Sequence, residues 1–247
     1  MSRLIFLGTA SAVPDKNHQN THLVIETLEN TILIDCVGNP VTRLDEARIN
    51  PLTITDLILT HFHPDHVSAV PLLLMDLWLM GRVDPINVFT LHEDIEKLKK
   101  ILGIFDWETW EGMFLVNFHN VPKENSILIN TSKLKVWASL VCHMIPAIGL
   151  RFEWSETTLC YSADTGPCDA VVQLAKEADI LIHEATGESE GHSSPEQAGE
   201  IAQKAGAKSL YLVHYPVGSD LEELNQQASK AYSGEVIVAK DLMSIEF

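Results

Sequence analysis

Short apolar runs that alternate with helical segments constrain the fold of this chain more than any other feature of its sequence. In the first half the pattern predicts strands at residues 4–7, 22–27, 31–34 and 57–60. It predicts helices at residues 71–80 and 93–102. In the second half it predicts strands at residues 134–140, 148–154, 158–162, 180–183 and 209–213. Two strand-rich halves of this kind favour an α/β fold with two sheets packed face to face and helices outside, a four-layer αββα sandwich.

One helix is marked at both ends by its residues. Ser194 is a typical N-cap, Pro195 suits the first turn, and Gln197 completes a capping box with Ser194. Gly206 follows the last apolar position and is a typical helix stop. We therefore predict a helix between Ser194 and Gly206.

The length and composition of the chain fit one globular domain over residues 1–247. A chain of 247 residues can bury one large core, and 46% of its residues are hydrophobic against 21% charged. The longest apolar stretch, residues 67–80, contains Asp76 and is too short to cross a bilayer. The apolar run at residues 4–7 stops at Gly8, which favours a strand over an export signal. We expect a soluble protein without a membrane partner.

The cysteines indicate the cellular compartment of the protein, and its net charge indicates which partners it can bind. The cysteines show no CxxC pairing, which is typical of reduced, mostly buried thiols in a cytoplasmic protein; they are Cys36, Cys142, Cys160 and Cys168. Seventeen basic and 34 acidic side chains give a net charge of −17. A polyanion would have to overcome that field, so the charge counts against a nucleic-acid partner.

Three histidines and an aspartate lie within the segment "HFHPDH", directly after a predicted strand. On an extended segment His61 and His63 leave the same face, while Phe62 points to the other side. Pro64 then turns the chain, so that residues 65–66 can supply a second, neighbouring metal position. Imidazole and carboxylate ligands suit zinc, which needs about four ligands per ion, so further ligands must come from elsewhere in the chain.

The segment resembles the HxHxDH signature of the metallo-β-lactamase superfamily, and the resemblance covers most of the chain. It implies two zinc ions per chain. The first ion takes the two HxH histidines, His61 and His63, and a third histidine, His143. The second ion takes the Asp-His pair, Asp65 and His66, and a last histidine, His214. The resemblance also implies that Asp164, in "LCYSADTG", bridges the two ions.

Three further stretches resemble the ribonuclease Z-like branch, which also contains arylsulfatases and small-molecule phosphodiesterases. They are "FLGTASAVP", "ILIHEAT" and "GHSSPEQA". The resemblance implies that His192 donates a proton to the leaving oxygen, with Glu184 and Asp65 in the supporting relay. A histidine titrates near neutral pH, so a carboxylate that orients it makes it a suitable proton donor.

A structural role is the alternative for several histidines. A lone histidine such as His143 is more often a core or surface group than a ligand, and His192 also fits a helix-capping surface residue. Four further histidines have no motif partner and are expected to be structural or surface residues; they are His18, His22, His92 and His119. His183 is also expected to be structural, because it leaves a strand next to Glu184 and the resemblance implies no metal role for it.

Two departures from ribonuclease Z bear on the substrate. In that enzyme a protruding basic arm that grips tRNA lies between the third metal histidine and the bridging aspartate, whereas only 20 residues lie between His143 and Asp164 and they are typical of a tight hairpin. The arginine of the Ser-x-Arg-Tyr type segment after the last histidine is also missing, since residues 215–218 read Tyr-Pro-Val-Gly.

The sequence therefore favours a dinuclear zinc-dependent hydrolase of the ribonuclease Z-like group that cleaves an ester bond of a small molecule, with a phosphodiester as the favoured substrate. The alternatives are a tRNA 3′-end processing endoribonuclease and a metal-loaded, non-catalytic binding or sensor protein. The resemblance implies a homodimer. Aromatic residues between 105 and 118 line either a substrate pocket or a subunit interface, and the apolar segment 70–82 is a candidate dimer face.

Overall fold

The computed structural model describes residues 2–247 and contains two seven-stranded mixed sheets, each in its own compact unit. The first unit comprises residues 2–8, Gln19–Val121 and Asp241–Phe247, and the second comprises Thr9–His18 and Pro122–Lys240. The predicted class is confirmed, because both halves form mixed sheets flanked by helices. The single domain over residues 1–247 stays a prediction.

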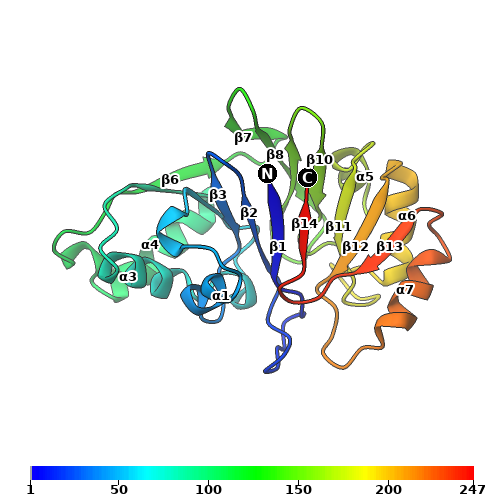
Figure 1. Ribbon diagram of the computed structural model, residues 1–247, viewed down its shortest axis with the longest axis horizontal. Helices are drawn as coiled ribbons and strands as arrows, with labels where there is room; N and C mark the ends of the chain where they lie inside the picture. The colour runs from blue at the N-terminus through cyan, green and yellow to red at the C-terminus, as the bar shows by residue number, and fades with distance from the viewer. Residues whose placement is uncertain (1) are drawn as a thin grey trace. The chain divides into compact units, whose positions relative to one another are not determined.

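The sheet of the first unit begins antiparallel and ends parallel (Figure 1). Its strands, in spatial order, are β14 (Ser244–Glu246), β1 (Arg3–Gly8), β2 (His22–Glu26), β3 (Thr31–Ile34), β4 (Asp56–Ile58), β5 (Ile86–Leu91) and β6 (Val116–Val121). The pairs from β14 to β3 are antiparallel, and those from β3 to β6 are parallel. The chain thus returns at its C-terminal end to pair with its first strand.

Helices of the first unit cover an apolar face of this sheet. They are α1 (Pro40–Glu46), α2 (Pro64–Val67), α3 (Val70–Leu79) and α4 (His92–Ile104), with the 3₁₀ turns η1 (Pro51–Thr53) and η2 (Trp107–Thr109). Leu57 of β4 and Val88 of β5 belong to one buried cluster with Leu73 of α3 and Leu98 of α4. Burial of a side chain of this size stabilises the fold by about 1.5–3 kcal/mol. This packing fixes the segment between β4 and α3.

The sheet of the second unit also has an antiparallel and a parallel half. Its strands, in spatial order, are β13 (Glu235–Val238), β12 (Ser209–Val213), β11 (Ile180–Glu184), β10 (Thr158–Tyr161), β9 (Ala147–Glu153), β8 (Lys135–Val141) and β7 (Ser126–Asn130). Strands β10 to β13 are parallel, so the segments that follow β10, β11 and β12 leave the same edge of the sheet. Asp164, Glu184 and His214 all lie at this edge.

Three helices accompany the second sheet: α5 (Asp169–Leu174), α6 (Pro195–Ala205) and α7 (Leu221–Ser229). The predicted caps of α6 are confirmed. The Ser194 side chain accepts from the backbone N–H of Gln197, whose side chain accepts from the backbone N–H of Ser194. Gly206 ends the helix with a left-handed φ of 69°. Within residues 2–247 no helix has the length and apolarity needed to cross a membrane.

Candidate functional site

The segment after β4 brings two imidazoles of the first unit together. Nε2 of His61 lies 3.1 Å from Nδ1 of His63. Phe62 packs against the core, as the alternation of side chains predicts. Two nitrogen ligands of one tetrahedral zinc ion, each bonded at about 2.0–2.1 Å, lie roughly 3.3 Å apart. The pair therefore fits two ligands of the same ion.

Asp65 and His66 occupy the short helix α2, for which His63 is the N-cap residue and Pro64 the first residue. His66 is fully buried, whereas Asp65 is partly exposed. An oxygen of Asp65 lies 3.7 Å from Nε2 of His66. The turn at Pro64 is thus the start of a helix, and it separates this pair from the His61 and His63 pair, as expected.

Asp35, which the sequence reasoning missed, holds both pairs in place. It follows β3, is fully buried and has a left-handed φ of 61°. Its carboxylate accepts from Nδ1 of His66 at 2.8 Å and from the Thr60 hydroxyl at 2.9 Å. Because that hydroxyl proton goes to Asp35, the Thr60 oxygen accepts from Nδ1 of His61 at 3.0 Å. Both histidines therefore carry their proton on Nδ1 and turn Nε2 to a ligand.

Burial raises the pKa of Asp35, and the contacts with His66 and Thr60 oppose that effect. The only sequence sign of its role was its place directly after a buried strand.

His143 of the second unit is fixed by the loop that carries His192. Its Nδ1 donates to the carbonyl of Gly191 at 2.7 Å, which leaves Nε2 as the acceptor nitrogen. Gly191 has a φ of 74°, and a Cβ there would lie 2.9 Å from the backbone nitrogen of Met144 and 3.0 Å from Nδ1 of His143. Only glycine lets the chain pass this close to the imidazole.

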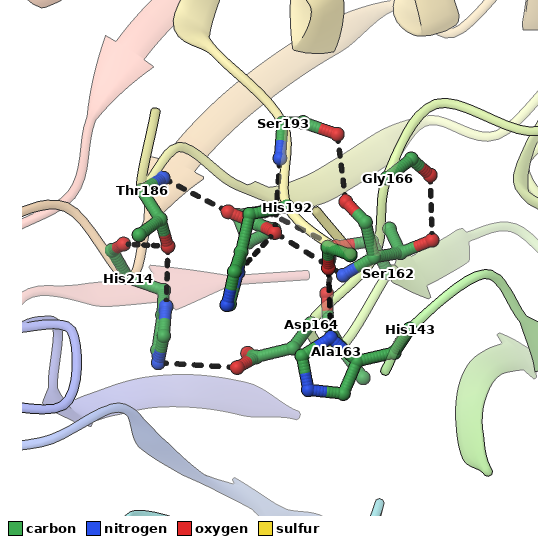
Figure 2. Close-up of polar contacts among 12 residues, drawn as sticks. His143, Ser162, Ala163, Asp164, Gly166, Thr186, His192, Ser193 and His214 are labelled. Atoms are coloured by element: carbon green, nitrogen blue, oxygen red, sulfur yellow. Dashed lines mark hydrogen bonds and ion pairs between the residues drawn. The ribbon is translucent and has the colours of Figure 1, made fainter. Parts of the chain in front are cut away.

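His214 is held by the Thr186 side chain (Figure 2). The Thr186 hydroxyl donates to the backbone carbonyl of His214 at 2.9 Å, so its oxygen accepts from Nδ1 of His214 at 2.7 Å. Nε2 of His214 then lies 3.4 Å from an oxygen of Asp164, which is itself almost completely buried. Thr186 lies in the "HEAT" stretch, but no role was predicted for it.

Glu184 is a buried carboxylate at the centre of the second unit's cluster. Its oxygens accept from Nδ1 of His192 at 2.9 Å and from the backbone N–H groups of Thr165, Thr186 and Ser193 at 2.8–3.2 Å. Four donors compensate for the burial of its charge. His192 keeps part of its side chain exposed and presents Nε2 away from Glu184.

The ligand atoms of His143, Asp164 and His192 all lie within 4.8 Å of one another, as do those of Glu184, His192 and His214. The predicted residues of the second unit thus form one cluster, and those of the first unit form another. Histidine and aspartate groups of this kind could hold metal ions, and they suit zinc.

The other histidines lie in structural surroundings. His183 is buried in β11 and donates Nδ1–H to the carbonyl of Glu184, and burial lowers its pKa. His22 begins β2, His92 begins α4, and His119 of β6 stacks on Phe89. The His18 ring lies tilted against the Tyr215 ring at a centroid distance of 4.8 Å.

The aromatic stretch and the apolar segment line one groove of the first unit. Its volume is about 570 Å³, and its walls include Leu72 and Met75 of α3, Ile101 of α4, Phe105 and Trp110. The two segments that the sequence singled out thus belong to one apolar surface.

Known proteins share both the fold and the sequence pattern. The ribonuclease Z of Methanothermobacter thermautotrophicus is 28% identical, over all of this chain and 97% of its own. The metallo-β-lactamase fold protein YhfI from Bacillus subtilis superposes with a TM-score of 0.86 at 21% identity, covering 100% of this chain and 99% of its own. Human tRNase Z, short form (ELAC1), has a TM-score of 0.82 at 25% identity, covering 99% and 98%.

These likenesses confirm the metallo-β-lactamase fold and the ribonuclease Z-like group, which consists of metal-dependent hydrolases. The alignment with the archaeal ribonuclease Z covers 297 positions, 50 more than the 247 residues of this chain, so the relative carries segments that this chain lacks. A family model described as Anti-Pycsar protein Apyc1 matches residues 2–233, and the chain therefore belongs to that family.

Proposed function

We propose that this chain is a phosphodiesterase that acts on a small molecule with two zinc ions per chain. In this proposal His61, His63 and His143 would hold one ion, Asp65, His66 and His214 would hold the other, and both ions would share Asp164. The order of these residues along the chain, which matches the superfamily pattern, supports the assignment. So do the hydrogen bonds on Nδ1 that turn Nε2 of His66, His143 and His214 to a ligand.

The ions would supply Lewis acidity, which lowers the pKa of a water nucleophile and offsets charge that develops on the phosphate. The chain's own residues then manage the proton. Glu184 accepts from Nδ1 of His192, so Nε2, the other nitrogen of that ring, is the atom that would donate a proton to the leaving oxygen. Asp65, a ligand in this proposal, also takes part in the relay. The hydrogen bond between the buried Glu184 and the partly exposed His192 is the observation that carries the catalytic proposal.

The short link between β9 and β10 favours a small substrate. Strand β9 ends at Glu153 and β10 begins at Thr158, and the backbone N–H of Trp154 donates to the carbonyl of Thr157 across the turn. The hairpin leaves no room for an RNA-binding arm at the place where ribonuclease Z carries one. The net charge of −17 also opposes binding to a polyanion.

Processing of tRNA 3′ ends is the second candidate, and the names of the relatives back it more directly than the small-molecule activity. Both the archaeal relative and the human neighbour are named for this activity. Two findings oppose tRNA processing. The alignment with the archaeal relative contains 50 positions that this chain lacks, and the matching family model is described as an anti-Pycsar protein and not as a ribonuclease. A non-catalytic metal-binding protein is the third candidate, but it would have no use for a proton relay.

A substrate panel separates these candidates. Zinc-loaded protein is assayed on bis(4-nitrophenyl) phosphate, cyclic mononucleotides, linear dinucleotides, aryl sulfates, carboxylic esters and a 3′-extended precursor tRNA. We expect phosphodiesters to be cleaved and the tRNA to be bound weakly at about physiological salt. A His61→Asn/His63→Asn variant controls for contaminating hydrolases. Efficient tRNA trimming at nanomolar enzyme would promote the second candidate, and inactivity on the whole panel would favour the third.

The homodimer also stays a proposal, with the apolar groove as its interface. Leu72 lines the groove, whereas Leu28 is 88% exposed elsewhere in the first unit. Light scattering after size exclusion should give the mass of two chains for the native protein and for Leu28→Lys, but of one chain for Leu72→Lys. An unchanged mass for Leu72→Lys would place the interface elsewhere.

A further inference from the structure

The four cysteines fall into two kinds. Cys36 and Cys160 are buried. Burial raises the pKa of both, to about 12 for Cys160, whose thiol donates to the carbonyl of Leu174 at 3.0 Å. Cys142 is instead exposed and Cys168 half-buried, which differs from the mostly buried thiols expected from the sequence. Two thiols of the second unit are therefore open to reagents in solution.

These two cysteines lie on the two sides of a short backbone bridge. Gly166 pairs with Cys142 and donates its N–H to the Cys142 carbonyl at 2.7 Å. Cys168 lies two residues further on, in extended backbone at the N-cap of α5. Burial, and after it the neighbouring Cys168 thiol, raise the pKa of Cys142. The Thr165 hydroxyl touches both residues: it accepts from the Cys142 N–H at 3.1 Å and lies 3.8 Å from Sγ of Cys168.

We propose that Cys142 and Cys168 form a redox-sensitive pair whose oxidation to an intrachain disulfide displaces His143. With a peroxide as oxidant, the exposed Cys142 thiol is oxidised to a sulfenic acid and one water is released. The Cys168 sulfur then attacks the Cys142 sulfur, the disulfide forms, and a second water leaves. In total two thiols and one hydrogen peroxide give one disulfide and two waters.

We expect disulfide formation to move the backbone, from the usual spacing of residues placed like these two beside an antiparallel bridge. Residues on the diagonal of an antiparallel pair have Cα atoms about 7–8 Å apart, whereas a disulfide needs about 4.4–6.8 Å. The bond would therefore draw the segment between Gly166 and Cys168 towards β8 by roughly an ångström. The two buried cysteines, Cys36 and Cys160, do not lie beside this backbone bridge.

The movement is transmitted to the candidate site. Cys142 is bonded directly to His143, and Thr165 lies between Asp164 and Gly166 in the segment that moves. The Thr165 N–H also donates to Glu184 at 3.2 Å. Loss of a group that supports a metal ligand lowers metal affinity by about tenfold to a hundredfold, and we expect this displacement to have a similar effect. This effect rests on the proposed metal centre, whereas formation of the disulfide does not.

The first test concerns the bond. The reduced full-length chain is exposed to hydrogen peroxide, and its thiols are counted and mapped by mass spectrometry without reduction. We expect two thiols lost per chain, a mass decrease of two hydrogen atoms, a peptide that links Cys142 to Cys168, and reversal by dithiothreitol. Cys36 and Cys160 should stay reduced. A disulfide between chains, or a sulfinic acid on Cys142 with Cys168 still free, would overturn the proposal.

The second test concerns the coupling. Zinc affinity is measured by competition with a chromophoric chelator before and after oxidation. We expect the oxidised chain to bind zinc about tenfold to a hundredfold more weakly, whereas Cys168→Ser should bind equally well before and after the same treatment. Unchanged affinity in the disulfide form would overturn the link to His143. If even the reduced chain bound no zinc, the proposed metal centre would fail, and the first test would still decide whether the pair forms.

Discussion

The carboxylate of Glu184 and the imidazole of His192 form a hydrogen bond of 2.9 Å in which the buried acid fixes Nδ1 of a partly exposed ring. The backbone N–H of Ser193, next to His192 in the chain, donates to the same oxygen at 3.1 Å. Two adjacent contacts therefore determine how this ring is oriented. Such an arrangement is typical of a general acid, in which a carboxylate orients one ring nitrogen and the other serves the substrate.

His192→Ala should keep both metals and substrate binding but lower turnover by about a hundredfold to ten-thousandfold, the usual contribution of a positioned general acid. The loss should depend on the leaving group. A nitrophenolate departs without protonation, so its loss should be small, whereas an alkoxide leaving group should show the full loss. Steady-state kinetics on the two substrates tests this. Equal losses would mean that His192 positions the substrate instead.

Gly191→Ala should weaken zinc binding, because the added Cβ would lie 3.0 Å from Nδ1 of His143 and 2.9 Å from the Met144 nitrogen. Gly218→Ala is the matched control. Its φ of 81° imposes similar backbone strain, but no atom lies within 4 Å of its added Cβ. Chelator competition should give at least about tenfold weaker binding for Gly191→Ala alone. Equal losses in both variants would reduce the role of Gly191 to backbone strain.

Asp35→Asn should also weaken zinc binding, by about tenfold to a hundredfold, because an amide replaces the carboxylate that orients His66 and Thr60. Asp56→Asn is a suitable comparison. Asp56 is another buried carboxylate of the first sheet, but it accepts from Thr55 and Asn87. Calorimetric zinc titrations of the two variants should differ. Native affinity in Asp35→Asn would show that His66 is held without the charge.

The sequence predicted the parts of the site that depend on neighbouring residues. The HxHxDH segment and the caps of α6 are local patterns, and both are found as expected. Asp35, Thr186 and Gly191 were missed because each acts on a histidine far along the chain: Asp35 on His66, Thr186 on His214 and Gly191 on His143. Contacts of this kind can be predicted only when the order of the strands in the sheet is known.

The strands likewise differ in whether local sequence or tertiary pairing determines them. The buried strands β3 and β12 were predicted with the bounds that the structure has, whereas the buried strand β5 was missed. The edge strands β13 and β14 have mixed, partly exposed residues, and only their pairing with β12 and β1 makes them strands. Tertiary hydrogen bonds therefore decide the strands that periodicity does not.

Acid should destabilise the fold through His22. Burial lowers the pKa of this imidazole to about 4, so the native state takes up the proton only near pH 4, whereas the unfolded chain takes it up near 6.5. Stability from this residue is thus present above pH 6.5 and is lost as the pH falls towards 4. The loss should amount to about 2 kcal/mol between pH 8 and pH 5.

Urea unfolding in the presence of a chelator checks this prediction. In His22→Asn the side-chain amide can donate to the Asn20 carbonyl in place of Nδ1 of the imidazole, but it does not titrate. The difference in unfolding free energy between pH 8 and pH 5 should be smaller for this variant than for the native chain. An equal difference would mean that other groups account for the acid sensitivity.

The proposed dinuclear centre is tested most directly by titrating metal-free protein with zinc while the rate of phosphodiester hydrolysis is followed. The seven candidate ligands form two sets that share Asp164, so activity should rise from zero and level off at two zinc ions per chain. Asp164→Ala, which lacks the shared carboxylate, should not reach that plateau. Activity that persists in excess chelator, or that is complete at one zinc ion per chain, would contradict the account.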